Sequence, residues 1–155
     1  MPMKELHSEI EINASAGLVW GVLTDFASYP EWNPFVRKIS GEPEVGERLE
    51  VRLEPPGGRG ITLRPTVLKA EPERELQWLG HLWVSGLFDG EHSLTIHRLG
   101  EDRVRFVQAE TFGGVLLPLF ARSLDEGTRR GFEEMNRALK ERAEAPREVP
   151  PTGTS

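Results

Sequence analysis

The segment 103–112 alternates in character and places two polar side chains on an otherwise apolar face. Its odd-numbered positions carry the arginines and are therefore expected to face solvent. Gln108 and Glu110 then point inward together with Phe106 and Phe112. An inward carboxyl group needs a hydrogen-bond partner, because an unpaired buried polar group costs about 1–3 kcal/mol. Glu110 is thus a candidate for binding the polar end of a ligand or for transferring a proton.

The preceding segment, 91–99, carries a histidine on its expected inner face, since His92 shares that face with the apolar residues of the strand. A hairpin with a three-residue loop pairs His92 with Glu110. A five-residue loop pairs His92 with Phe112 and makes Glu110 a diagonal neighbour. Both registers bring the imidazole and the carboxyl group within interaction range. The alternative is a polar cluster of the core, in which His92, Gln108 and Glu110 satisfy one another and water.

Aromatic side chains supply the apolar area that a ligand cavity needs. Trp78 shares a strand face with Leu76 and is expected to point inward. Trp32 lies in a Pro-Glu-Trp-Asn-Pro turn and is expected at the junction of sheet and helix. Phe120 belongs to an apolar helical stripe, whose members pack the core or line a cavity. The candidate ligand-binding residues are therefore His92, Gln108, Glu110, Trp78, Trp32, Phe106, Phe112 and Phe120.

The composition disfavours several other chemistries. The chain of 155 residues has no cysteine, which removes disulfides, thiolate metal sites and cysteine nucleophiles. Its four histidines are not spaced as metal ligands, so no metal or other cofactor is expected. The net charge of −6 opposes binding to nucleic acid. No apolar run is long enough to span a membrane or to form a signal peptide, which makes a cytoplasmic protein the expectation.

Hydrophobic periodicity indicates the elements that would position these residues. Residues 4–12 alternate as a half-buried strand, and two short helices are expected between residues 13 and 34. Residues 114–143 show a helical period, which predicts a helix of about 24 residues. Between residues 34 and 114 the chain is divided by turns into strand-like segments. Pro65 suggests that the segment 61–70 lies at a sheet edge or carries a bulge. Six strands fit, at about 35–40, 48–54, 61–70, 75–83, 87–99 and 103–112.

Several stretches resemble proteins of the SRPBCC superfamily, which includes polyketide cyclases and lipid-transfer domains. They are IEINASAGLVW at 10–20, LTDFASYPEWNPF at 23–35, and the segments 74–80, 90–94, 105–113 and 131–140. The resemblance, which favours the cyclase-like branch, implies an α+β helix-grip fold. In this fold a curved seven-stranded antiparallel sheet wraps around a long C-terminal helix, with two short helices after the first strand. It also implies a cavity between the sheet and that helix. We expect one domain over residues 1–144 and a disordered tail over residues 145–155.

The expected function is the binding or carrying of a small hydrophobic or aromatic molecule in this cavity, for which a volume of about 300 Å³ or more is typical. The alternative is an enzyme of the cyclase or dehydratase kind that uses His92 and Glu110 for proton transfer. A third possibility is a protein-interaction module without a cavity. The sequence does not indicate the oligomeric state.

Overall fold

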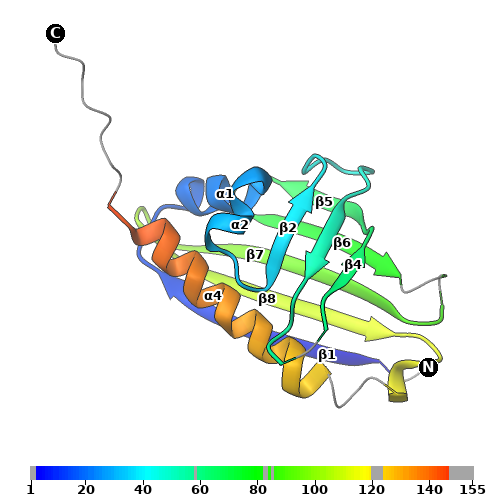
Figure 1. Cartoon of the computed structure of the whole chain (residues 1–155). Coiled ribbons are helices and arrows are strands. Elements are labelled where there is room, and N and C mark those ends of the chain that lie inside the picture. The colour runs from blue at the N-terminus through cyan, green and yellow to red at the C-terminus, as the bar shows by residue number, and fades with distance from the viewer. Residues whose placement is uncertain (1–2, 58, 82–83, 85, 120–123, 147–155) are drawn as a thin grey trace, which may run out of the picture.

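The computed structural model describes residues 3–57, 59–81, 84, 86–119 and 124–146 and has an α+β architecture (Figure 1). The chain begins with strand β1, continues through three short helical elements and seven further strands, and ends in helix α4. The elements are β1 (Lys4–Ile12), α1 (Ala16–Thr24), the 3-10 turn η1 (Phe26–Ser28), α2 (Tyr29–Trp32), β2 (Val36–Ser40), β3 (Glu50–Leu53), β4 (Ile61–Leu63), β5 (Thr66–Glu71), β6 (Glu75–His81), β7 (Asp89–Gly100), β8 (Arg103–Gly113), the π-helical turn η2 (Leu124–Thr128) and α4 (Arg129–Glu144).

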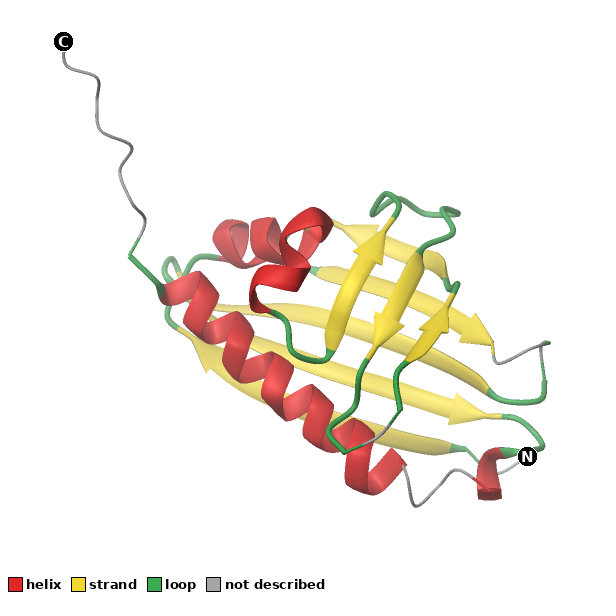
Figure 2. Ribbon diagram, in the orientation of Figure 1, coloured by secondary structure: helices red, strands yellow, loops and turns green. Residues whose placement is uncertain are grey.

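The strands form two antiparallel sheets rather than the single seven-stranded sheet that we expected. The larger sheet has the order β1-β8-β7-β6-β5, and the smaller has the order β2-β3-β4. The short strands cross in front of the long ones, and α4 lies beside them on the same face (Figure 2). The difference arises at Pro65, where the predicted third strand 61–70 divides into β4 and β5. A proline has no N–H for a sheet ladder and favours such a break.

The two sheets remain connected at this break. Arg48 forms an isolated antiparallel bridge with Thr66, and the Leu49 N–H donates to the Pro65 carbonyl oxygen at 2.8 Å. The backbone of the smaller sheet therefore bends over the larger one and leaves an interior between them.

The hairpin of β7 and β8 has the register that we predicted for a three-residue loop. His92 lies opposite Glu110, and Leu94 lies opposite Gln108. The connection itself is shorter, because Gly100 pairs with Arg103 and a bulge between residues 98 and 100 restores the register of the inner face. Asp89 and Gly90, which lie inside the expected strand 87–99, belong to β7.

Helix α4 covers β1 and β8 with a fully buried apolar stripe that includes Phe132, Met135 and Leu139. It has 16 residues and is therefore shorter than the expected helix of about 24 residues. Leu119 belongs to the apolar pattern of the segment 114–143 for which we expected a helix. It is 75% exposed, because it precedes α4 and lies outside the contact of that helix with the sheet. Among the described residues, no helix combines the length and apolar character needed to cross a membrane.

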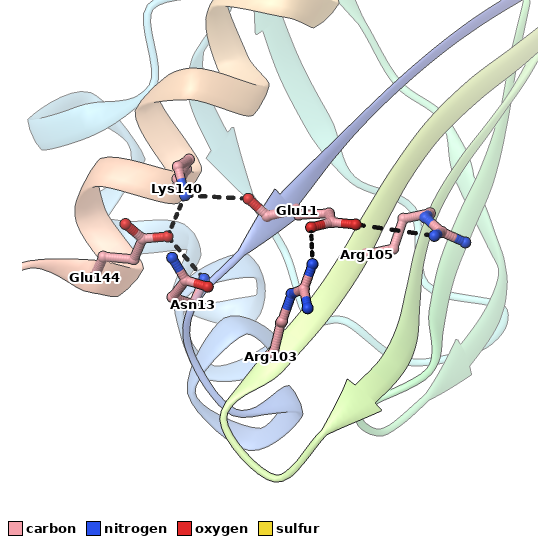
Figure 3. A network of polar contacts seen from close by, with 6 residues as sticks. All are labelled: Glu11, Asn13, Arg103, Arg105, Lys140 and Glu144. Atoms are coloured by element: carbon pink, nitrogen blue, oxygen red, sulfur yellow. Dashed lines mark hydrogen bonds and ion pairs between the residues drawn. The ribbon is translucent and has the colours of Figure 1, made fainter.

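A network of charged residues anchors the end of α4 to β1 (Figure 3). Lys140 donates to the backbone oxygen of Glu11 at 3.2 Å and to the carboxylate of Glu144. Glu144 in turn accepts from the backbone N–H of Asn13 at 2.7 Å. The Glu11 carboxylate binds Arg103 at the start of β8. Helix and sheet are thus joined at the end of the interface by contacts between three elements.

Candidate functional site

A cavity of about 180 Å³ lies between the two sheets. Its walls come from β6, β7 and β8 on one side and from β3 and β4 on the other, and Thr128 before α4 also lines it. The lining is mostly apolar and consists of Phe35, Val51, Leu53, Pro55, Ile61, Leu63, Pro65, Trp78, Gly80, His81, Phe88, Gly90, His92, Glu110, Phe112 and Thr128. The cavity is smaller than the expected 300 Å³. It also lies between sheets rather than mainly between the sheet and the C-terminal helix, because α4 fills the space over β1 and β8.

Two glycines explain why space remains over β6 and β7. Gly80 and Gly90 lie opposite each other on these strands and both line the cavity. Neither has a side chain to occupy the space beneath β3 and β4. Our sequence interpretation missed both residues. The strand period could have identified them, because residues two apart share a face. Gly80 is two residues from the inward Trp78, and Gly90 is two residues from the inward His92.

A row of inner-face side chains crosses the large sheet beside these glycines. Trp78 on β6 lies opposite His92 on β7, and His92 lies opposite Glu110 on β8. On the far side of Glu110, β1 contributes Leu6. The predicted juxtaposition of imidazole and carboxyl group is therefore present, and both groups line the cavity.

Glu110 lies close to the backbone of β7. A Cβ atom added at Gly90 would lie only 2.2 Å from Glu110 Oε2, so the absence of a side chain at Gly90 makes room for this carboxyl group. The Glu110 side chain is 15% exposed, and burial raises its pKa to about 8. At neutral pH Glu110 is consequently a carboxylic acid that retains its proton.

His92 is held between aromatic rings. Its imidazole stacks on Phe132 of α4, with centroids 5.0 Å apart, and meets Trp78 edge-on at 5.2 Å. Burial lowers the pKa of His92 to about 4, although its hydrogen bond to Gln108 acts in the opposite direction. The imidazole is therefore neutral at pH 7, and its Nδ1 lies 3.6 Å from Glu110 Oε1.

A chain of amides orients this imidazole. His92 Nε2 lies 2.8 Å from Gln108 Oε1, and Gln108 Nε2 donates to Asn136 Oδ1 at 2.9 Å. Asn136 Nδ2 then donates to Ser8 Oγ at 2.9 Å. In this assigned orientation the Gln108 oxygen accepts, so His92 carries its proton on Nε2 and presents the Nδ1 lone pair towards Glu110.

Asn136 is a functional candidate that our sequence interpretation missed. It lies on the buried stripe of α4, one turn after Phe132, and is 2% exposed. A polar residue inside an apolar helical stripe was the available signal, since such a group requires a partner. Only the tertiary structure shows that this partner is Gln108.

Of the other candidate ligand-binding residues, some line the cavity and others do not. Trp78 and Phe112 line the cavity, whereas Gln108 and Phe106 are fully buried and do not line it. Trp32 lines a separate hollow of about 230 Å³ formed by α1, α2 and the end of α4. Phe120 lies outside the described residues, as does the predicted tail from residue 147 onward.

A second histidine lies at the rim of the cavity. His81 Nδ1 is 2.7 Å from Asp89 Oδ1, and both Asp89 oxygens accept from the Gly86 N–H at 3.1 Å. These contacts join the end of β6 and Gly86 to the start of β7. No group of three or more potential metal-ligating residues occurs in the described part of the chain.

We expect the substitution Gly90→Ala to displace the Glu110 carboxyl group with little loss of stability. The new Cβ would collide with Oε2, which is the end of a flexible side chain, whereas its nearest contact outside Glu110, a ring carbon of Phe112, is at an ordinary 3.5 Å. Affinity for a ligand held by Glu110 should fall about tenfold, or about 1.4 kcal/mol. Isothermal titration of the unmodified protein and of the variant with a small aromatic probe measures the change in affinity.

Gly100→Ala is the matched control, because a Cβ at Gly100 on the same strand meets nothing within 4 Å. Equal affinities for the two variants would show that the Glu110 position is unimportant for binding.

The fold is found in a recognisable class of protein. The chain is similar over its whole length to the Zhui aromatase/cyclase from a Streptomyces species, with a TM-score of 0.74 and 20% identity over 99% of this chain and 100% of that one. It is also similar to a START superfamily protein from Mycobacterium smegmatis, with a TM-score of 0.69 and 19% identity over 90% of this chain and 97% of that one. These similarities show a START-like fold, and the family match over residues 3–144 confirms the superfamily resemblance.

Residues 3–144 match the family described as polyketide cyclase / dehydrase and lipid transport, and the chain belongs to this family. A further similar structure is norcoclaurine synthase from Thalictrum flavum, crystallised with dopamine and hydroxybenzaldehyde, with a TM-score of 0.70 and 16% identity over 95% of this chain and 90% of that one. No match was found among curated proteins.

Proposed function

We propose that this protein binds a small hydrophobic or aromatic molecule in the cavity between its two sheets. The single observation that carries the proposal is the mostly apolar cavity of about 180 Å³ with one partly buried acid and one buried imidazole on its wall. Binding cavities commonly combine apolar walls with a few convergent polar groups that orient the ligand. The family to which the chain belongs includes lipid transport in its description, which supports a binding role.

The cavity limits the size of the ligand. A cavity of about 150 Å³ in another protein accommodates benzene. The volume of about 180 Å³ therefore suits one ring with a small substituent, and a larger molecule would have to extend through the mouth.

A specific observation also favours a second function, that of a cyclase- or dehydratase-like enzyme. Glu110 retains its proton at neutral pH while His92 presents an unprotonated nitrogen 3.6 Å away. An acid and a base in one cavity are suited to removing a proton from one atom of a substrate and delivering a proton to another. In this reading Glu110 is the general acid and His92 Nδ1 the general base.

One experiment tests both functions. Native mass spectrometry of the protein, purified gently from its source, is expected to show a retained small molecule of about one ring. The recovered molecule is then returned to ligand-free protein and followed by mass spectrometry over time. An unchanged mass supports binding, whereas conversion that is lost in Glu110→Gln supports the enzyme.

The control for this experiment is Glu91→Gln. Glu91 is an exposed carboxylate on the outer face of β7, one residue from His92. Absence of a retained molecule, together with failure of small aromatic probes to enter the cavity, would contradict both functions.

A further inference from the structure

The polar groups on the cavity wall have a definite pattern of donors and acceptors. The protonated Glu110 carboxyl group offers one O–H donor and one carbonyl acceptor, and His92 Nδ1 offers one acceptor, because its other nitrogen is committed to Gln108. No lysine or arginine is among the described residues that line the cavity. The site is therefore complementary to a neutral group that both accepts and donates a hydrogen bond.

The distance between these groups is suited to a single oxygen atom. His92 Nδ1 and Glu110 Oε1 are 3.6 Å apart, which is longer than a direct hydrogen bond. One hydroxyl oxygen can lie about 2.8 Å from both atoms at once. It would accept the proton of Glu110 and donate its own proton to His92 Nδ1.

The walls around this pair are suited to a flat ring. Trp78, Phe88 and Phe112 contribute aromatic faces or edges to the cavity, and Phe88 stacks on Phe112 at 5.7 Å. Aromatic rings pack well against such walls. The available volume accommodates one ring with a small substituent.

We propose that the cavity binds a single-ring phenol whose un-ionised hydroxyl group bridges Glu110 and His92. This proposal rests on the proposed ligand-binding function and specifies the head group of the ligand. A carboxylate ligand is disfavoured, because the described lining has no lysine or arginine to balance its charge and His81 already contacts Asp89. An ammonium ligand is disfavoured because it is strongly hydrated, and the mostly apolar walls replace only part of its water.

Binding of such a phenol should depend on the protonation of Glu110. On the inner faces of the two neighbouring strands, the titratable groups nearest Glu110 are His92 on β7 and Lys4, which lies diagonally across on β1. His81 also lines the cavity. Burial is the cause of the raised pKa of about 8 at Glu110. Affinity for the phenol should be constant in the neutral range and fall as Glu110 ionises above pH 8.

The test uses four probes of nearly equal size: p-cresol, toluene, benzoate and benzylamine. Isothermal titration at pH 6.5 is expected to show that p-cresol binds at least about tenfold more tightly than each of the others. Glu110→Leu should reduce the affinity for p-cresol to that for toluene. Glu91→Gln should keep the difference in affinity between p-cresol and toluene.

A pH series provides the second readout, which does not depend on the folding of the leucine variant. For the unmodified protein the affinity for p-cresol should fall by about tenfold for each pH unit above 8. In Glu110→Gln, which retains a donor and an acceptor, it should stay constant up to about pH 9, below the ordinary ionisation range of a phenol near 10.

The two proposals fail in different ways. If none of the four probes binds, the ligand-binding function itself is wrong. If toluene binds as tightly as p-cresol, if benzoate or benzylamine binds most tightly, or if the pH series of Glu110→Gln matches that of the unmodified protein, ligand binding stands and the phenol proposal is overturned.

Discussion

Replacement of Phe132 by alanine is expected to lower the free energy of unfolding by about 3–5 kcal/mol. Phe132 is fully buried on α4, where its ring packs edge-to-face on Phe35 at 5.7 Å and against the His92 imidazole at 5.0 Å. Truncation removes this apolar contact and leaves a void between the helix and both sheets. Urea unfolding followed by circular dichroism measures the change.

The matched control for this substitution is Leu119→Ala. Both residues belong to the apolar stripe that the sequence predicts, but Leu119 is 75% exposed and Phe132 is 0% exposed. We expect Leu119→Ala to change the unfolding free energy by less than about 0.5 kcal/mol. A loss below about 1 kcal/mol in Phe132→Ala, or similar losses in the two variants, would contradict the packing described for α4.

The second large effect is expected in the pH dependence of stability when Glu110 is replaced by glutamine. The folded protein holds a proton on Glu110 up to a pKa of about 8, whereas the unfolded chain releases it near the ordinary value of 4.5. Between these values the folded state binds more protons, so the wild type loses stability as the pH rises. Glu110→Gln does not titrate and should gain about 2 kcal/mol relative to the wild type between pH 6.5 and 8.

His92 acts in the opposite direction and at lower pH. Its pKa falls from 6.5 in the unfolded chain to about 4 in the folded protein, so its contribution to stability is lost as the pH falls through this window. Because His92 is present in both proteins, its effect largely cancels in the comparison.

Urea titrations at closely spaced pH values measure the difference between wild type and Glu110→Gln. Glu91→Gln removes an exposed carboxylate from the outer face of β7. Its curve of unfolding free energy against pH should run parallel to that of the wild type. Parallel curves for Glu110→Gln and the wild type would show that Glu110 is solvated in the folded protein, which would also remove the acid from the proposed site.

Local alternation was sufficient to predict the inner face of the β7–β8 hairpin. The arginines at the odd positions of β8 are compatible only with its outer face, so Gln108 and Glu110 had to point inward. Since inner faces must match across a hairpin, both plausible loop lengths placed His92 near Glu110. The choice between the two registers depended on the bulge near Leu99, which the sequence pattern did not indicate.

The location of the cavity could not be predicted in the same way. It depends on the break at Pro65, which separates β4 from β5, and on the way in which the smaller sheet bends over Gly80 and Gly90. Periodicity reports which face of a strand is buried but not what covers that face. For the same reason Trp32, an aromatic residue near a helix, was assigned to a cavity that it does not line.

By itself the sequence determined the broad succession of strands and helices and the inward direction of His92 and Glu110, because periodicity and parity are properties of each segment alone. The superfamily followed from the resemblance of its motifs. Only the tertiary structure decided that Asn136 and Gln108 orient His92, that glycines leave room for the carboxyl group of Glu110, and that two sheets enclose the cavity. These features arise from residues far apart in the chain, and their chemistry depends on distances and burial that exist only once the sheets and helix have packed.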